Sequence, residues 1–160
     1  MDELIKFDNL REILNKFGVE LVEQYKQNLI DNKRPATGDL GNTVKFNLKE
    51  KNNTYTITLN LQDYWYYVEN GRKAGKVPPI NKIIDWIKIK PVLPYPDRSG
   101  RLPTTEQLGF LISRKIAEEG TKGTNDLRKA TDDIYSKFQL AIYEAINKDF
   151  EKAIIKIFKY

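Results

Sequence analysis

Two short runs in which apolar and polar residues alternate strictly constrain the fold more than any other feature of this sequence. Apolar residues occupy every second position over 44–48 and again over 55–61, with threonines between them in the second run. The connecting turn, Lys51-Asn52-Asn53, is short and rich in residues that tolerate positive φ. Such a pattern predicts an antiparallel β-hairpin with one apolar face. That face needs a cover, because a two-stranded hairpin alone is at best marginally stable in water.

The segment before the hairpin predicts an amphipathic helix from about Asn9 to Asp31. Its apolar residues recur at three- and four-residue steps and therefore share one face. Asn9 with Glu12 is typical of a capping pair, and Lys33-Arg34-Pro35 ends the helix because the residue before proline resists helical angles. This helix can cover the hairpin. The predicted fold class is therefore α+β, with a hairpin or small sheet packed against the N-terminal helix.

Further helices are predicted after the hairpin. Pro79 suits the first turn of a helix with an apolar stripe, and Pro91 ends that helix. Thr104 with Gln107 forms a capping box for the next one. The proline-rich segment 90–103 between them predicts an extended, exposed loop, and loops of this length inside compact domains are usually functional or mobile.

The C-terminal segment has a helical pattern from Asn125 to about Phe158. Unbroken, these 34 residues would span about 50 Å, more than the diameter of a small domain, so the helix would overhang. A break near Thr131-Asp132-Asp133 is the alternative and would let the tail fold back. The far end carries Phe150 and Ile154 on an apolar side that a lone domain would leave exposed.

Length and composition bound the class of protein. The 160 residues predict a single domain over 1–160, with a core over about 9–124 and a C-terminal helical extension over about 125–160. No apolar run approaches the roughly 20 residues that span a bilayer, and Met1-Asp2-Glu3 has the wrong charge for a signal peptide. We therefore expect a soluble protein with no membrane partner. Lys and Arg exceed Asp and Glu by 27 to 22, which permits contact with DNA or an acidic protein and requires neither.

The chain has no cysteine and no histidine. It therefore lacks a thiolate nucleophile, the commonest general base and the commonest metal ligand. The three serines Ser99, Ser113 and Ser136 have no histidine to activate them, and adjacent carboxylates such as Glu118-Glu119 diverge by about 100° on a helix. We predict no catalytic residue, no cofactor, no metal and no small-molecule substrate. A magnesium site built from carboxylates alone stays open.

Residues 64–72, the aromatic cassette, begin with four consecutive aromatic residues and end in Gly-Arg. If the cassette is helical, Tyr64 and Tyr67 share one face, Trp65 and Tyr66 lie on a second, and Gly71 ends the helix in the left-handed conformation. Four aromatics in a row cannot all point inward, and an exposed ring is a candidate for burial against a partner subunit. The predicted subunit interface comprises Tyr64, Trp65, Tyr66, Tyr67, Glu69, Arg72, Phe150 and Ile154.

Two basic clusters are candidates for contact with nucleic acid or an acidic partner. They are Arg72, Lys73 and Lys76 in a glycine-containing turn, and Lys148, Lys152 and Lys156, with Lys159, along one face of the last helix. The alternative for the second cluster is a solvated helix face. The glycine-rich runs 71–76 and 120–124 lack the Walker spacing, so helix termination and turns are favoured there over a phosphate cradle.

Four motifs follow one another between about residues 35 and 127. Residues 37–43 are similar to Ser/Thr-Gly-x-Leu-x-x-Ser/Thr, and residues 64–72 to Tyr-Ala-x-Tyr-Val-Glu-x-Gly. Residues 75–86 are similar to Gly-Lys-x-Pro-Pro-x-x-x-Ile-x-x-Trp, and residues 108–124 to Leu-Ala-Phe-x-Ile-Ala-Arg-Lys-Ile followed by a Gly-Thr turn. Together they resemble the tail-completion and neck proteins of tailed bacteriophages. Trp65 stands where that family has a small residue, and Asp126 where it has an aromatic one.

This resemblance implies a structural role without catalysis. It implies a homo-oligomeric ring of six or twelve subunits in the neck or tail-completion region, joining head to tail around a DNA channel. The implied partners are copies of the chain itself, the neighbouring portal-side connector and tail proteins, and the DNA that passes through. The implied location is the virion, after assembly in the host cytoplasm.

Two alternatives from other classes stay open. One is a basic DNA-binding module without catalytic activity, which would use Arg72, Lys73, Lys76 and the terminal lysines. The other is an enzyme that uses a carboxylate-held magnesium ion.

Overall fold

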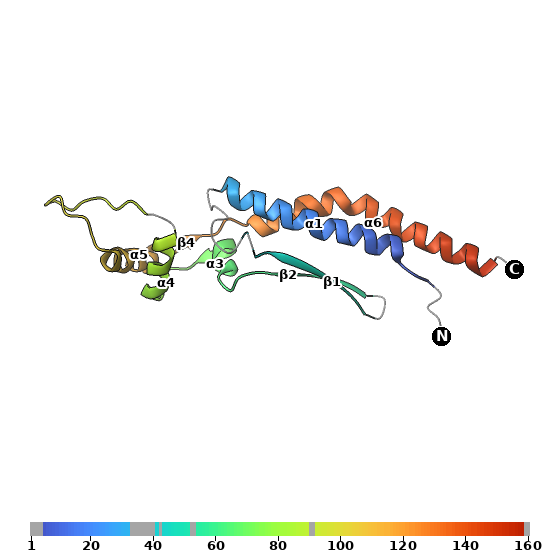
Figure 1. Cartoon of the computed structure of the whole chain (residues 1–160), viewed down its shortest axis with the longest axis horizontal. Coiled ribbons are helices and arrows are strands. Elements are labelled where there is room, and N and C mark those ends of the chain that lie inside the picture. The colour runs from blue at the N-terminus through green and yellow to red at the C-terminus, as the bar shows by residue number, and fades with distance from the viewer. Residues whose placement is uncertain (1–4, 33–40, 42, 52–53, 90–91, 159–160) are drawn as a thin grey trace. The chain divides into compact units, whose positions relative to one another are not determined.

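The computed structural model describes residues 5–32, 41, 43–51, 54–89 and 92–158 (Figure 1). This part of the chain forms five helices and four short strands, and the predicted α+β class is confirmed. Several predicted features lie outside the described residues. They are the turn at Asn52 and Asn53, the helix ends at Pro35 and Pro91, most of the 37–43 motif, and Lys159.

The chain falls into two compact units. Unit 1 combines residues 1–62 with residues 126–160, and unit 2 consists of residues 63–125. The expectation of a single domain over 1–160 stays a prediction.

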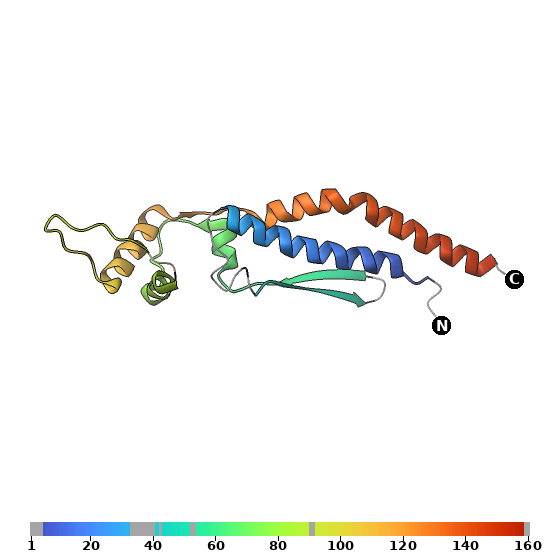
Figure 2. The same ribbon diagram turned by 45° about the horizontal axis from the view of Figure 1, so that its top comes forward.

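Unit 1 is built on two long helices that lie side by side (Figures 1 and 2). They are α1 (Asp8–Asp31) and α6 (Asp126–Phe158), and they run antiparallel, since the start of each contacts the end of the other. Their shared seam is apolar, and the rings of Phe17 and Phe138 meet edge to face with centroids 5.7 Å apart. The buried side chains of the seam are Leu21, Tyr25 and Leu29 from α1 and Ala130, Ile134, Phe138, Ala145 and Ala153 from α6.

Helix α6 is continuous, which confirms the predicted long C-terminal helix and excludes the alternative of a break near Thr131-Asp132-Asp133. The reason is local: the Thr131 hydroxyl donates to the Leu127 carbonyl at 2.8 Å, which satisfies the side chain within the helix. No proline or glycine interrupts residues 126–158.

Buried aspartates link α6 to both ends of α1. At one end the Asp149 carboxylate accepts hydrogen bonds from the backbone N–H groups of Asn9 and Leu10, at 3.1 and 2.9 Å, and from the Asn9 side chain. At the other end the Asn28 side chain donates to the Asp126 carbonyl at 2.9 Å. The predicted Asn9–Glu12 capping pair is therefore wrong, because Asn9 lies inside α1 and Asp149 satisfies the first-turn donors instead.

The predicted hairpin is confirmed. Strands β1 (Lys45–Lys51) and β2 (Thr54–Asn60) pair antiparallel with Lys51 opposite Thr54. The hairpin packs on α1 through Phe46. A Cβ added to Gly18 would stand only 2.4 Å from the Phe46 ring. The N-terminal helix therefore covers the apolar face of the hairpin, as predicted. The lack of a side chain at Gly18 permits the close approach of Phe46 to α1.

Unit 2 holds the remaining elements: α3 (Trp65–Asn70), β3 (Gly71–Arg72), α4 (Ile80–Ile89), α5 (Thr105–Glu119) and β4 (Thr121–Lys122). The Thr104–Gln107 capping box is present as predicted. Helices α4 and α5 pack at Gly109, where an added Cβ would meet Ile84 at 2.8 Å. Both α3 and α5 end at a glycine with φ of 74°, Gly71 and Gly120, which confirms the predicted terminations.

Candidate subunit interface and basic surfaces

The aromatic cassette occupies α3 and leaves most of its rings in solvent. Tyr66 and Tyr67 are 56% and 52% exposed, Tyr64 is also exposed, and Trp65 is half-buried. Neighbouring rings meet nearly at right angles, with centroids 6.0 Å apart for Trp65–Tyr66 and for Tyr66–Tyr67. Tyr64 and Tyr67, which spacing places on one face, are both exposed, and Trp65, on the second face, is the most covered of the four rings. A helix of six residues is too short for periodicity to decide which face is buried.

The two glycine-rich runs, 71–76 and 120–124, meet at the C-terminal end of α3. Strands β3 and β4 pair antiparallel, with Gly71 opposite Lys122. The approach is close: a Cβ on Gly71 would stand 2.2 Å from the Thr121 carbonyl oxygen, and one on Gly123 would stand 2.2 Å from the Glu69 carbonyl oxygen. We call this junction, residues 68–72 with 120–125, the glycine clip. It holds the end of α3 in place, which is a structural use of both runs.

Several backbone donors of the glycine clip already have carbonyl partners. Thr124 N–H donates to the Val68 carbonyl at 3.2 Å, and Asn125 N–H donates to the Glu69 carbonyl at 3.1 Å. A phosphate cradle needs free N–H groups that converge on an anion. The structure thus supports the helix-termination interpretation of this run.

Arg72 is held against the cassette. Its guanidinium lies 5.6 Å from the centroid of the Tyr67 ring and donates to the Lys76 carbonyl at 2.9 Å. The same turn is anchored to α5, since Gly75 N–H donates to the Ala117 carbonyl at 2.7 Å. Lys73 and Lys76 are exposed. The first basic cluster is therefore a fixed turn beside exposed aromatic rings.

Glu69 has a different environment from the rest of the predicted interface. It is buried within unit 2, whereas the neighbouring tyrosines are exposed. The structure thus assigns Glu69 a place inside the unit. The interface role predicted for the cassette rests on the aromatic rings and Arg72.

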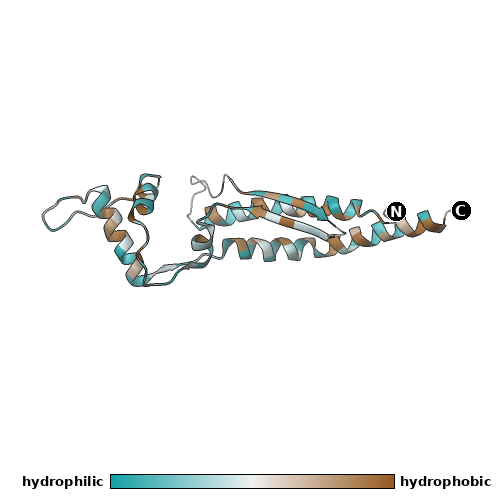
Figure 3. Cartoon of the chain, turned by 90° about the horizontal axis from the view of Figure 1, so that it is seen from below, coloured by the Kyte–Doolittle hydropathy of each residue, from teal (hydrophilic) through white to brown (hydrophobic). Residues whose placement is uncertain are grey.

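The last turns of α6 expose the predicted apolar side. The Phe150 ring packs edge to face on Phe7 with centroids 5.7 Å apart, and part of it remains in solvent. Ile154 and Ile157 are exposed as well, and these turns are brown among teal in Figure 3. Tyr143, an exposed ring on the same side, was not predicted from the sequence. Its signal was the seven-residue spacing of positions 143, 150 and 157.

The second basic cluster lies along the same part of α6. Lys148, Lys152 and Lys156 are exposed, and none of them forms an ion pair with any residue that the structure describes. The Lys152 ammonium contacts the Asn9 side-chain oxygen at 3.3 Å. These lysines belong to unit 1, and the Arg72 cluster belongs to unit 2.

The three serines lie in different local environments. The Ser99 hydroxyl donates to Asp97 at 2.6 Å, and the Ser136 hydroxyl donates to the Asp132 carbonyl at 2.8 Å. Ser113 is fully buried in α5, and its hydroxyl has no hydrogen-bond partner among the residues described. In that same part of the chain, no three Asp or Glu residues gather where they could hold a metal ion.

Three residues with shifted pKa values, Arg11, Glu50 and Tyr55, lie where the hairpin meets α1. Arg11 donates to Glu50, and this hydrogen bond is the main cause that lowers the pKa of Glu50 and raises the pKa of Arg11. Burial, followed by the hydrogen bond with Glu50, raises the pKa of Tyr55 to about 12. The Tyr55 hydroxyl also contacts the Phe7 carbonyl at 3.4 Å. These groups link the hairpin to α1 and the residue before it.

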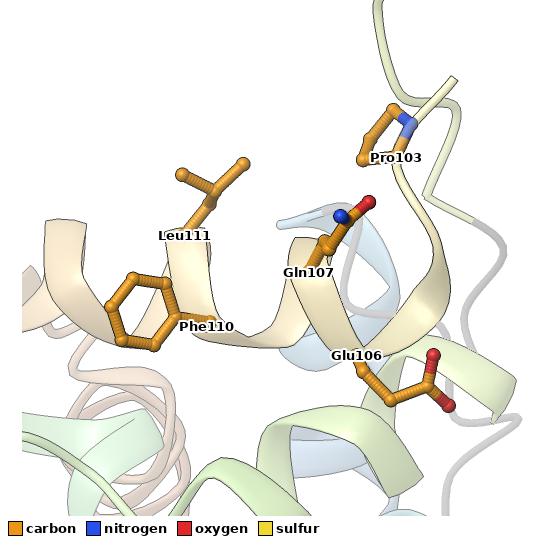
Figure 4. A pocket seen from close by; sticks show the side chains of 5 residues that line it. All are labelled: Pro103, Glu106, Gln107, Phe110 and Leu111. Atoms are coloured by element: carbon orange, nitrogen blue, oxygen red, sulfur yellow. The ribbon is translucent and has the colours of Figure 1, made fainter. Parts of the chain in front are cut away.

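A hollow of about 490 Å³ lies on the outer face of α5. Figure 4 shows its lining along the first turns of the helix, with Pro103, Gln107 and Leu111 in one row and Glu106 and Phe110 in the next. This hollow was not predicted from the sequence. The sequence feature that could have indicated it is the adjacent apolar pair Phe110-Leu111, because one buried face of a helix cannot hold both side chains.

Comparisons with protein families, with curated proteins and with solved structures find no match to this chain. No helix in the part of the chain that the structure describes has the length and apolarity to cross a membrane.

Proposed function

We propose that this chain is a structural, non-catalytic subunit of a homo-oligomeric ring in the neck or tail-completion region of a tailed bacteriophage. The observation that carries the proposal is the exposed aromatic cassette fixed in place by the glycine clip. Rigid aromatic rings bury a large area at low entropic cost, so they are favoured in the centres of protein interfaces. The resemblance of four consecutive motifs to neck and tail-completion proteins supplies the class of assembly.

The remaining exposed surfaces support the same role. A subunit of a closed ring uses two different surfaces, one for each of its two neighbours. This chain has apolar exposed residues both in the cassette and at the end of α6. The proposed partners are further copies, in a ring of six or twelve, with the portal-side connector and tail proteins above and below and the DNA within. The proposed location is the virion, after assembly in the host cytoplasm.

The test compares matched tyrosine variants in the full chain. The variant with Tyr66 and Tyr67 both replaced by alanine should remain a monomer in light scattering at concentrations where the wild type forms an oligomeric ring. The reason is that each substitution removes an aromatic side chain that is about half exposed in the single chain. Tyr135→Ala is the control, since Tyr135 is 54% exposed on α6 and lies outside the predicted interface. Electron microscopy of the parent particle gives the independent answer. A neck without this chain, or normal assembly of the double variant, would refute the proposal.

A second candidate function, binding of duplex DNA without catalysis, is favoured by one observation. The α6 lysines are exposed and form no ion pair with any described residue. If they contact phosphates, changing Lys148, Lys152 and Lys156 to glutamine should reduce the salt dependence of duplex binding by about 0.9 in log–log slope for each phosphate that is no longer neutralised. An unchanged slope would remove this candidate.

A further inference from the structure

The segment between α4 and α5 has apolar side chains that its own chain does not cover. We call residues 92–103 the arm. It has no regular secondary structure and leads away from α4 and α5 in Figure 1. Leu93 and Tyr95 are 89% and 92% exposed, and Leu102 is also exposed. Solvent-exposed single apolar residues are ordinary, but two nearly bare ones in a short arm form a surface that gains free energy when covered.

The tip of the arm has a defined conformation. The Asp97 carboxylate accepts hydrogen bonds from Ser99 N–H at 2.8 Å and Arg101 N–H at 2.9 Å, and Asp97 N–H donates to the Arg101 carbonyl at 2.9 Å. Gly100 closes the turn with φ of 80°. Hydrogen bonds from the Ser99 side chain and from the backbone of Arg101 and Ser99 also lower the pKa of Asp97. A turn fixed before binding loses less entropy on binding.

The tip is positively charged. Arg98 and Arg101 are exposed, and neither forms an ion pair within the described parts of the chain. The turn uses only the backbone of Arg101. Both guanidinium groups are therefore available to a carboxylate on another molecule.

The α5 hollow has the complementary character. Phe110 and Leu111 give it an apolar wall, and the carboxylate of Glu106 lies at its edge (Figure 4). A hydrogen bond from its own backbone N–H, followed by one with the Thr104 side chain, lowers the pKa of Glu106. Glu106 forms no ion pair with the residues described.

We propose that the arm of one copy of this chain lies in the α5 hollow of the next copy. Leu93 and Tyr95 would cover Phe110 and Leu111, while Arg98 and Arg101 would face Glu106. The arm does not fill its own hollow, because its apolar residues are nearly bare in the single chain. Duplex DNA fits the arm less well, since phosphates would pair with the arginines but would leave the leucine uncovered.

Such a contact is heterologous, because the two surfaces that meet are different. Heterologous contacts close into rings when the rotation between copies allows it. The inference rests on the proposed function and deepens it, since it names a contact between neighbouring subunits that the aromatic cassette does not supply.

Disulfide trapping tests the contact directly, because the chain has no cysteine of its own. Pro96→Cys places one thiol beside Tyr95 on the arm, and Leu111→Cys places one in the hollow. A mixture of the two single variants should form a crosslinked heterodimer under mild oxidation. Leu140→Cys replaces Leu111→Cys in the control mixture, since Leu140 is an exposed leucine of α6. Crosslinking no greater than in the control would overturn the inference.

Charge reversal provides a second measurement. Glu106→Arg, or Arg98→Glu with Arg101→Glu, should each raise the concentration of half-assembly by about tenfold or more. Combining the two sets of changes should restore assembly, because the charges are then exchanged across the same contact. Combined variants that assemble no better than either set would overturn the inference, and so would arginine variants that lose only duplex DNA binding.

The outcomes separate this inference from the proposed function. A wild-type ring that gives no specific arm–hollow crosslink removes the arm contact and leaves the ring. A specific crosslink in a chain that is absent from the phage neck keeps the arm contact and removes the proposed function.

Discussion

The Asp149 carboxylate offers the sharpest test of how unit 1 is held together. It is 1% exposed and satisfies the backbone N–H groups of Asn9 and Leu10 in the first turn of α1. These donors have no partner within their own helix, and Phe7 at the start of α1 supplies no side-chain cap. Asp149 therefore performs for α1 the role of a capping residue, from a position 140 residues away from Asn9.

The size of the effect follows from these contacts. Hydrogen bonds to a charged group contribute about 1.5–3 kcal/mol, and a negative charge at a helix N-terminus adds about 0.3–1 kcal/mol. Because bonds that share one acceptor are not additive, we expect Asp149→Ala to lower the free energy of unfolding by about 3 kcal/mol. Asp149→Asn keeps one acceptor oxygen and loses the charge, so about 2 kcal/mol is expected.

Urea unfolding followed by far-UV circular dichroism measures these losses. The chain concentration must be low and constant, since assembly would add stability by mass action. Asp132→Ala is the matched control, because Asp132 is an exposed aspartate on the same helix and its loss should change stability by less than about 0.5 kcal/mol. If Asp149→Ala costs no more than this control, Asp149 does not act as the cap of α1. Faster hydrogen exchange at the amides of Asn9 and Leu10 would localise the loss.

Three further predictions concern close packing and ionisation. Gly71→Ala should destabilise unit 2 by about 3 kcal/mol in thermal unfolding, because it combines φ of 74° with a Cβ 2.2 Å from a carbonyl oxygen. Gly75→Ala, with φ of 123° and open space around it, should cost clearly less; equal losses would show that the clash is unimportant. Gly18→Ala should lower the free energy of unfolding by about 1–3 kcal/mol, because the new Cβ meets the Phe46 ring at 2.4 Å. Adding Phe46→Leu should recover part of this loss, and no recovery would contradict the contact. The folded pKa of Tyr55, about 12, lies above the ordinary 10.0, so its contribution to stability is present below pH 10 and is lost as the pH rises to 12. Tyr55→Phe should make that alkaline loss smaller, and an identical pH profile of urea midpoints would contradict the assignment.

Much of the local structure could be predicted from the sequence because its causes lie within a few residues. Alternation over 44–61 determined the hairpin, and the absence of proline and glycine after residue 125 determined the long helix α6. Gly71 and the Thr104–Gln107 pair set element ends through backbone angles and short hydrogen bonds. The exposed aromatic and apolar residues of the candidate interface were predictable in the same way, as surplus rings for which one core has no room.

The tertiary structure alone decided which distant segments meet. Nothing in the local pattern pairs Gly71 with Lys122, places Asp149 on the first turn of α1, or leaves Tyr67 exposed while Trp65 is covered. Each of these depends on the shape of two separate surfaces and on their approach within a few ångströms. Periodicity reports only the average environment of one segment, so it cannot specify such a contact.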